Sequence, residues 1–208
     1  MSLDTRTALL DAAQERFSKQ GFAGTSMREL ATAVGIRESS IYKHFTSKHA
    51  IFQAVLARAE QSVVALASAL GMEIENPDVA GSVYEEIALA QLVEVADAFF
   101  GMWLHDPNVA NVRRLLTIDQ YRSPEAARLL RELTFERPIA FQAEVMAGLM
   151  ERGAFEEGDP MAAALAFWGP VMSLTTLAED PARETEARRL LLAHVEHFHS
   201  THRRMEKS

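Results

Sequence analysis

Apolar residues recur every three or four positions along most of the chain, and no stretch alternates apolar and polar positions as a β-strand would. This pattern predicts an all-α fold. The first segment places Leu9, Ala13 and Phe17 on one face and ends at Gly21, a residue suited to the left-handed conformation that closes a helix. The chain therefore opens with an amphipathic helix.

Three more helices are predicted in the first third of the chain. Ser26 and Glu29 have the spacing of a capping box, which marks the start of a short helix. A second short helix covers about residues 37–44, and Thr46 or Ser47 can cap a third, longer one. This last helix is long enough to bridge two regions, and its apolar stripe consists of Ile51, Phe52, Val55, Leu56, Ala59, Val63, Leu66 and Leu70.

Beyond these helices the pattern predicts a loop followed by more helices. Residues 71–82, GMEIENPDVAGS, lack periodicity and contain the residues typical of a loop. Pro138 and Pro170 fall inside helical patterns, where proline kinks or breaks a helix. Aspartate followed by proline, a pairing typical of helix starts, occurs at residues 106–107, 159–160 and 180–181. The predicted helices cover residues 83–105, 108–121, 124–152, 160–178 and 181–205.

The two short helices have the spacing of a helix-turn-helix. Ala31 lets them cross closely, Gly35 allows the sharp turn, and Ile41 locks the second helix against the first. The second helix of such a motif can enter the major groove of DNA. An ordinary helical hairpin with a polar face has the same spacing, so the motif alone leaves both interpretations open. The polar residues on the outer side are Arg37, Glu38, Ser39, Ser40, Tyr42, Lys43 and His44.

The distribution of charge changes what the total charge suggests. A net charge of −8 argues against binding to nucleic acid, because phosphates repel carboxylates. Residues 1–50, however, carry seven Lys or Arg and five carboxylates, a balance of +2, whereas the other 158 residues carry 14 and 24, a balance of −10. Such asymmetry is expected when one end of a chain meets a polyanion, although charge runs are usually solvated faces.

The composition excludes several other classes of protein. The chain has no cysteine, so it can form no disulfide, thiolate zinc site or cysteine nucleophile. No run approaches the roughly 18 apolar residues of a membrane span, and the N-terminus lacks a signal-peptide pattern, so we expect a soluble cytoplasmic protein without a membrane partner. We find no phosphate loop, nucleophile elbow or metalloprotease motif, and therefore expect neither an enzyme nor a cofactor.

The stretch GFAGTSMRELATAVGIRESSIYKHFTSKHAIF, residues 21–52, resembles the N-terminal domain of the TetR family of transcriptional regulators. The resemblance rests on Gly21-Phe22, Thr25-Ser26, Leu30-Ala31, Val34-Gly35-Ile36, Ile41-Tyr42, His44-Phe45 and Lys48. It implies a three-helix DNA-binding domain over residues 1–48 and a larger helical domain for ligand binding and dimerisation over residues 49–208.

In function, the resemblance implies a homodimeric repressor that binds a palindromic operator in double-stranded DNA. A small apolar or aromatic effector would enter the larger domain and release the DNA. A helical adaptor without DNA binding is the alternative, and it would leave the polar face of residues 37–44 without a role.

The same resemblance implies roles in DNA binding for individual residues. Contacts with phosphates are implied for Thr25, Ser26, Tyr42, His44 and Lys48. Positions near the base edges are implied for Arg37, Glu38, Ser39 and Lys43, and Ser40 completes the candidate set. The chain departs from the family pattern at Arg37, often a Ser or Thr cap, at Ser39, often Gly, and at His49, often a capping Glu.

Large apolar residues in the second half of the chain are candidates for a ligand cavity. At helical spacing such residues are more often core, and for any one of them that interpretation stays open. The family resemblance implies that some line a cavity, and we select Phe99, Trp103, Tyr121, Phe141 and Trp168. Dimer contacts are predicted through Ala162, Ala163, Ala164 and Ala166 in one helix and Ala187, Leu191, Val195 and Phe198 in the last helix.

Four histidines near the C-terminus could suggest a metal site, because His-x-x-His on a helix places two imidazoles on one face. They are His194, His197, His199 and His202. No third ligand stands at a matching spacing, so we predict surface or interface positions for them and no metal.

Overall fold

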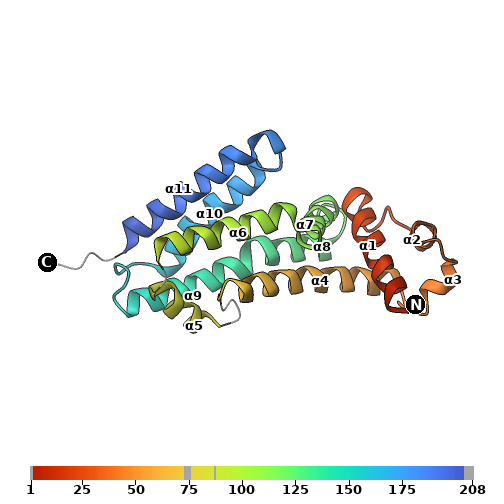
Figure 1. The fold of residues 1–208 in the computed structure, drawn as a ribbon, viewed down its shortest axis with the longest axis horizontal. Helices are drawn as coiled ribbons and strands as arrows, with labels where there is room; N and C mark the ends of the chain where they lie inside the picture. Colours follow the sequence, from red (N-terminus) through yellow and green to blue (C-terminus); the bar gives the residue numbers. More distant parts are fainter. Residues whose placement is uncertain (1, 73–75, 87, 204–208) are drawn as a thin grey trace. The chain divides into compact units, whose positions relative to one another are not determined.

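A computed structural model of the chain describes residues 2–72, 76–86 and 88–203, and over these residues the chain is helical with no named strand. The predicted all-α class is confirmed (Figure 1). The elements are α1 (Ser2–Gln20), α2 (Met27–Val34), α3 (Glu38–Ile41), α4 (Lys48–Ala69), α5 (Pro77–Glu86), α6 (Leu89–His105), α7 (Pro107–Asp119), α8 (Pro124–Arg131), the π-helical η1 (Glu132–Glu136), α9 (Arg137–Glu151), α10 (Pro160–Leu177), the 3-10 helix η2 (Pro181–Arg183) and α11 (Glu184–His202).

The chain forms two compact units. The first consists of Met1–Val63 and His105–Arg131, and the second of Val64–Leu104 and Glu132–Ser208. The first unit therefore adds α7 and α8 to the N-terminal helices. The predicted division at residue 48 concerns function, and it stays a prediction.

The first unit has a dense apolar core. Within it α1 packs against α2 and α7, α2 packs against α3, and α7 packs against α8. Leu9, Phe17, Leu30, Ile41 and Ile51 are fully buried. Because burying a side chain of this size contributes about 1.5 to 3 kcal/mol, this core can hold even the four-residue helix α3 in place.

The second unit is a bundle in which α9 packs against α5 and α10, and α10 packs against α11. One buried cluster joins Ala80, Val145, Leu149 and Phe198. Two further clusters bring the buried faces of α6 and α11 together. The apolar helix faces in these clusters are thus buried within this unit.

Aspartate caps start several helices as the sequence predicts. Asp106 accepts backbone hydrogen bonds at the start of α7, Asp159 at the start of α10, and Asp180 at the start of η2. Each is followed by a proline in the first turn, where the missing N–H costs no helical hydrogen bond.

The predicted loop at residues 71–82 is partly wrong, because α5 begins at Pro77. Asn76 supplies the cap: its side chain accepts from Val79 N at 3.4 Å and its carbonyl from Ala80 N at 2.9 Å. Burial of Ala80 in the cluster with α9 then stabilises a segment that has weak periodicity of its own. Residues 73–75 of that loop lie outside the described residues.

Two long helices predicted from periodicity are divided in the structure. The helix expected over residues 83–105 is split between α5 and α6, and residue 87 lies outside the described part. The helix expected over residues 124–152 becomes α8, η1 and α9, with Pro138 in the first turn of α9. Pro170, in contrast, lies inside α10 without ending it, and the helix continues to Leu177.

By length and composition alone, α4 and α10 could each cross a membrane. Core helices of soluble proteins meet the same criterion, so the two helices do not establish a membrane span. The two helices differ in burial within this chain: 17% of the most apolar window of α10 is buried, against 28% of that of α4.

Candidate nucleic-acid interface

Helix α2 is capped at both of its ends. At the start of α2, Ser26 Oγ accepts from Glu29 N at 3.2 Å, and the Glu29 carboxylate accepts from Ser26 N at 2.7 Å. The hydrogen bonds that Ser26 N and Ser26 Oγ donate to the Glu29 carboxylate lower the pKa of Glu29. At the other end Gly35 has a φ of 73°, and Ile36 N donates to Ala31 O at 3.0 Å. The predicted capping box and glycine turn are both confirmed.

Ser26→Ala should lower the free energy of unfolding by about 1 kcal/mol, because it removes the N-cap acceptor of α2. Denaturant titration followed by circular dichroism measures this change. Ser68→Ala, at an exposed position inside α4, is the control and should change stability by less than about 0.5 kcal/mol. Equal stability of the two variants would show that the cap contributes nothing.

Helix α3 presents an exposed polar face above a buried anchor. Ile41 and Phe45 are buried in the core of the first unit. Tyr42, a large aromatic residue, is nevertheless 53% exposed. Ser40 and His44 are half-buried, whereas the exposed side chains are Arg37, Glu38, Ser39, Tyr42 and Lys43. A rigid helix with free donors and acceptors is what readout of base edges requires.

Two of the candidate phosphate ligands bind the chain's own backbone. The buried hydroxyl of Thr25 donates to Gly21 O at 3.1 Å. Lys48 Nζ donates to Phe22 O and to Thr25 O, both at 2.8 Å. Burial lowers the pKa of Lys48, while Asp119 and Glu29 favour its charged form. Their predicted phosphate contacts stay predictions, but both residues hold the turn between α1 and α2.

One cation near α3 is absent from the candidate set. The guanidinium of Arg6, an exposed residue of α1, lies over the ring of Phe45 at 4.9 Å from its centroid. Arg6 therefore adds a positive charge beside the end of α3. No local motif marks it, since the contact depends on how α1 packs against residues nearly forty positions further on.

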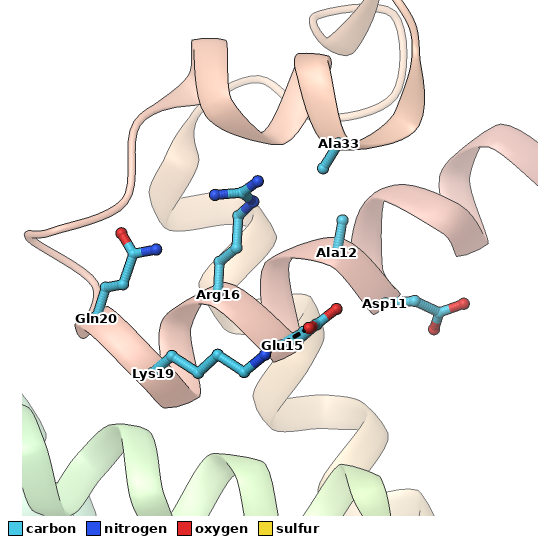
Figure 2. A pocket seen from close by; sticks show the side chains of 7 residues that line it. All are labelled: Asp11, Ala12, Glu15, Arg16, Lys19, Gln20 and Ala33. Carbon is cyan, nitrogen blue, oxygen red and sulfur yellow. Dashed lines mark hydrogen bonds and ion pairs between the residues drawn. The ribbon is translucent and has the colours of Figure 1, made fainter.

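A hollow of about 390 Å³ opens on the first unit beside α1 and α2 (Figure 2). Its lining is charged: Lys19 pairs with Glu15 at 2.6 Å, and Arg16 lies between the two helices. The full lining is Asp11, Ala12, Glu15, Arg16, Lys19, Gln20 and Ala33. Mixed charges at the surface make it a poor match for an apolar ligand.

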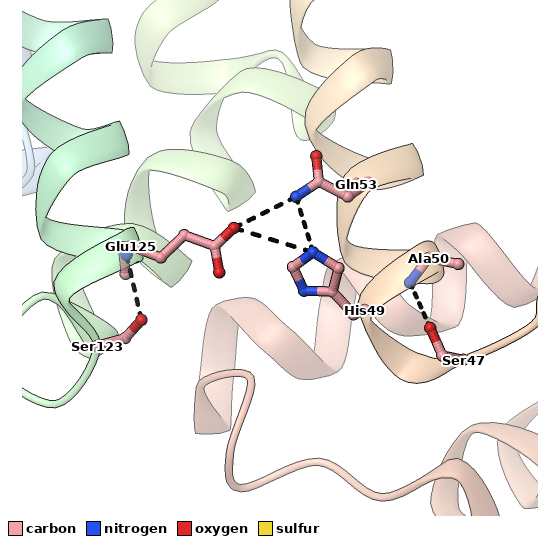
Figure 3. A network of polar contacts seen from close by, with 7 residues as sticks. Ser47, His49, Ala50, Gln53, Ser123 and Glu125 are labelled. Carbon is pink, nitrogen blue, oxygen red and sulfur yellow. Dashed lines mark hydrogen bonds and ion pairs between the residues drawn. The ribbon is translucent and has the colours of Figure 1, made fainter.

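The first turns of α4 and α8 face each other through a polar network (Figure 3). Gln53 Nε2 lies 3.2 Å from His49 Nε2 and 3.4 Å from Glu125 Oε1, and His49 Nε2 lies 3.9 Å from the same carboxylate oxygen. Ser47 caps α4 through Ala50 N at 3.0 Å. His49, where the family often has a capping Glu, thus contacts α8 side chains while Ser47 performs the capping.

The candidate ligand residues are distributed over both units. Phe99 and Phe141 pack against buried clusters of the second unit, and Trp168 Nε1 donates to Thr134 O at 2.8 Å. Trp103, also in the second unit, has a buried ring N–H without a hydrogen-bond partner. Tyr121, in contrast, belongs to the first unit and is 89% exposed. The structure therefore encloses four of the five residues at least partly and leaves Tyr121 open to solvent.

A second hollow, of about 400 Å³, lies in the second unit. It is lined by Ala147, Met150, Glu151, Glu157, Gly158 and Pro160. None of the five candidate ligand residues lines this hollow or the one beside α1.

The predicted dimer stripe of the last helix is wrong. Ala187, Leu191, Val195 and Phe198 are buried in the chain's own clusters. Ala163 and Ala164 of α10 are likewise buried within the chain. Ala162 and Ala166 are exposed on α10, beside Met161 and Leu165. Periodicity located an apolar face on α11 correctly but could not say whether the same chain or a second copy covers it.

The C-terminal histidines take part in packing. His194 Nε2 lies 2.9 Å from Phe167 O, and the ring of His202 stacks on Phe198 at 4.0 Å between centroids. Within the described part of the chain, no group of three His, Cys, Asp or Glu residues is placed to hold a metal ion.

The N-terminal segment, residues 9–55, matches the family model described as "Bacterial regulatory proteins, tetR family". The HTH-type transcriptional regulator UidR of Escherichia coli (strain K12) is 38% identical over 61 residues, which make up 29% of this chain and 31% of UidR. The chain thus matches less than a third of the length of that relative.

Similarity in structure extends over nearly the whole chain. The crystal structure of a TetR-family transcriptional regulator from Mesorhizobium loti MAFF303099 has a TM-score of 0.68 and 26% identity, covering 98% of this chain and 99% of that one. SmeT, the repressor of a multidrug efflux pump in Stenotrophomonas maltophilia, has also been solved in complex with triclosan. That complex has a TM-score of 0.65 and 16% identity over 98% of this chain and 93% of SmeT, a likeness of fold alone.

Proposed function

We propose that this chain is a transcriptional regulator of the TetR family and that it binds operator DNA through α3, and the match of residues 9–55 to that family's model supports the proposal. The observation that carries the proposal is a contrast at α3: its residue Ile41 is fully buried, while Arg37 before it and Tyr42 and Lys43 after it are exposed. The family consists of regulators and not of enzymes. Accordingly, we expect the protein to act in the cytoplasm as a repressor.

Within this proposal, Ser26, Tyr42 and His44 contact phosphates, while Arg37 and Lys43 lie near base edges. Hydroxyl, phenol and imidazole groups suit phosphate oxygens, and they set the register of the helix on the duplex. An arginine suits guanine in the major groove, and Glu38 can accept from cytosine N4. Thr25 and Lys48 would support these contacts by holding the backbone before α2.

Selection of genomic DNA fragments by the purified protein tests the proposed function. Bound fragments should share an imperfect palindrome, and affinity should fall steeply as salt rises, because phosphate binding releases counterions. Genes beside the selected fragments would then indicate what is regulated. Fragments without a common sequence, bound with no dependence on salt, would contradict the proposal and favour a helical adaptor.

We propose further that the protein is a two-fold dimer through α10. Met161 and Leu165 are exposed on this helix, and Ala162 and Ala166 next to them are small enough to permit close approach of a second helix. An exposed apolar face of this kind is a typical contact surface between copies of a chain. A dimer would present two copies of α3 to a palindromic operator.

For the effector, we propose a mostly apolar aromatic compound bound in the second unit, among Phe99, Trp103, Phe141 and Trp168. The solved complex of SmeT with triclosan supports a small-molecule effector. The contribution of Tyr121 stays a prediction.

Buried polar atoms suggest how such a ligand would be oriented. Gln142 is buried, and its Oε1 has no hydrogen-bond partner. Burial raises the pKa of Tyr84, while the Gln142 side chain acts in the opposite direction. Trp103 Nε1 is a second buried atom without a partner. A compound that brings a donor to Gln142 would satisfy a group whose burial otherwise costs free energy.

Gln142→Leu should weaken the binding of a phenolic effector by about 2- to 10-fold, because one hydrogen bond is lost. It should not weaken the binding of the same compound without its hydroxyl. Intrinsic fluorescence measures both affinities, with Trp103 and Trp168 as the tryptophans of the chain. Gln91→Leu, on the exposed side of α6, is the matched control.

Effector binding should also lower operator affinity, by about 5- to 150-fold for a typical coupling free energy. By linkage, operator DNA must weaken effector binding by the same factor. Compounds that bind tightly while operator affinity stays constant would show that the second unit does not control DNA binding.

A further inference from the structure

The turn between α1 and α2 is held by opposite charges from two other helices. Asp119, the last residue of α7, accepts a hydrogen bond from Phe22 N at 2.6 Å. Lys48, the first residue of α4, binds the carbonyl oxygen of that same residue, Phe22, and that of Thr25. The N–H and the C=O of one residue are therefore bound by a carboxylate and an ammonium group. Charge-assisted hydrogen bonds of this kind are stronger than neutral ones.

The carboxylate of Asp119 is enclosed by the turn, and the turn has no space for a larger residue at Gly21. Asp119 is 5% exposed. A Cβ atom added at Gly21 would lie 2.4 Å from Asp119 Oδ1, and Gly21 has a φ of 77°, so glycine is required there on two grounds. The ring of Phe22 packs against that of Phe52, with 5.3 Å between the centroids, and Lys48 Nζ lies 4.3 Å from the Phe22 centroid. Backbone and side chain of the turn are thus both fixed.

A second tether joins α7 to α1. The side-chain amide of Gln14, a buried residue of α1, donates to the carbonyl oxygen of Pro107 at the start of α7. With Asp119 at the other end, both ends of α7 are bound to α1 or to the turn that follows it. Helix α7 lies outside residues 9–55, the segment that matches the family model.

We propose that Asp119 is a positioning residue for DNA binding, which acts from α7 through Phe22 on the start of α2. This inference rests on the proposed function. The chain of contacts is short: Thr25 closes the turn onto Gly21 O, and the next residue, Ser26, caps α2. Since α2 packs on α3, a displaced turn shifts the recognition helix relative to the DNA.

Two variants separate the hydrogen bond of Asp119 from its charge. Asp119→Ala removes both, whereas Asp119→Asn keeps an oxygen that can accept from Phe22 N. The matched control is Val112→Ala, at a buried position of α7, which weakens the core without touching the turn. All variants are compared as full-length protein at a temperature where circular dichroism shows them folded.

Two readouts are then measured: the NMR shift and exchange rate of the Phe22 amide proton, and operator affinity by fluorescence anisotropy at fixed salt. In Asp119→Ala the amide should move upfield and exchange faster, and operator affinity should fall about tenfold or more. Asp119→Asn should show the same changes at smaller size, with affinity reduced about threefold by loss of the charge opposite Lys48. Val112→Ala should melt earlier but keep both the Phe22 amide signal and the operator affinity of the wild type.

Either readout can overturn the inference. An unchanged Phe22 amide in Asp119→Ala would show that Asp119 does not hold the turn, and an altered amide with wild-type affinity would show that the turn does not position α3. If Asp119→Ala fails to fold, Asp119→Asn decides by the same criteria. A wild-type protein that binds no DNA would instead refute the proposed function, while the amide readout would still decide whether Asp119 fixes the turn.

Discussion

Leu165→Asp is expected to lower operator affinity by about a hundredfold or more, the loss that follows when two linked binding units become independent. Leu165 is 42% exposed in the single chain, so a carboxylate there should leave the fold intact. In the proposed dimer the same carboxylate would be buried against apolar residues of α10 without a partner, at a large cost in free energy. The variant should therefore be a folded monomer.

Sedimentation at micromolar concentration and anisotropy with a palindromic operator measure the two effects. The control is Val64→Asp, which places the same charge at an equally exposed apolar position of α4. It should remain dimeric and bind DNA as the wild type does. In the dimer, the two half-sites should lie about 34 Å apart or somewhat more. A wild-type protein that sediments as a monomer would contradict the proposal, as would a dimeric Leu165→Asp.

Arg37→Ala should lower affinity for the operator by about 5- to 150-fold, corresponding to roughly 1 to 3 kcal/mol for a contact with a base edge. Its preference at one base-pair position should relax, because an exposed guanidinium at the start of α3 is suited to guanine. Tyr42→Phe removes only the phenol oxygen and should weaken binding to every sequence alike. Selection from a randomised operator library, repeated at several salt concentrations, distinguishes the two patterns.

Lys48→Ala provides the comparison for these two variants. Because its ammonium group binds two carbonyl oxygens of the chain, this variant should lose thermal stability as well as DNA affinity. Arg37→Ala and Tyr42→Phe should keep the melting temperature of the wild type, since both side chains are exposed. If Arg37→Ala and Tyr42→Phe both bound DNA as the wild type does, α3 would not be the helix that reads the operator.

Much of the first unit could be predicted because its signals are local. The capping box of Ser26 and Glu29 and the turn at Gly35 each depend on residues within a few positions, and backbone geometry alone fixes what such spacings form. The buried anchor Ile41 follows from helical periodicity in the same way. The sequence therefore determined the helix-turn-helix and the polar face of α3.

Boundaries were less predictable where packing competes with local pattern. Residues 77–82 read as a loop, yet the burial of Ala80 against α9 makes them part of α5. The stripe of Leu191 and Val195 read as a dimer contact, yet this chain covers it. Periodicity shows that a face is apolar and does not show what lies against it, since that depends on residues far away in the chain.

The sequence by itself determined the all-helical class, the aspartate caps and the short helix α3, because each depends on residues spaced within about one helical turn. Only the tertiary structure decided that Lys48 binds backbone carbonyls and that Asp119 reaches Phe22, across 97 positions of the chain. No periodic pattern contains such a contact. A buried carboxylate is favourable only where folding brings a donor to it, and in this chain the donor is Phe22 N, from the turn before α2.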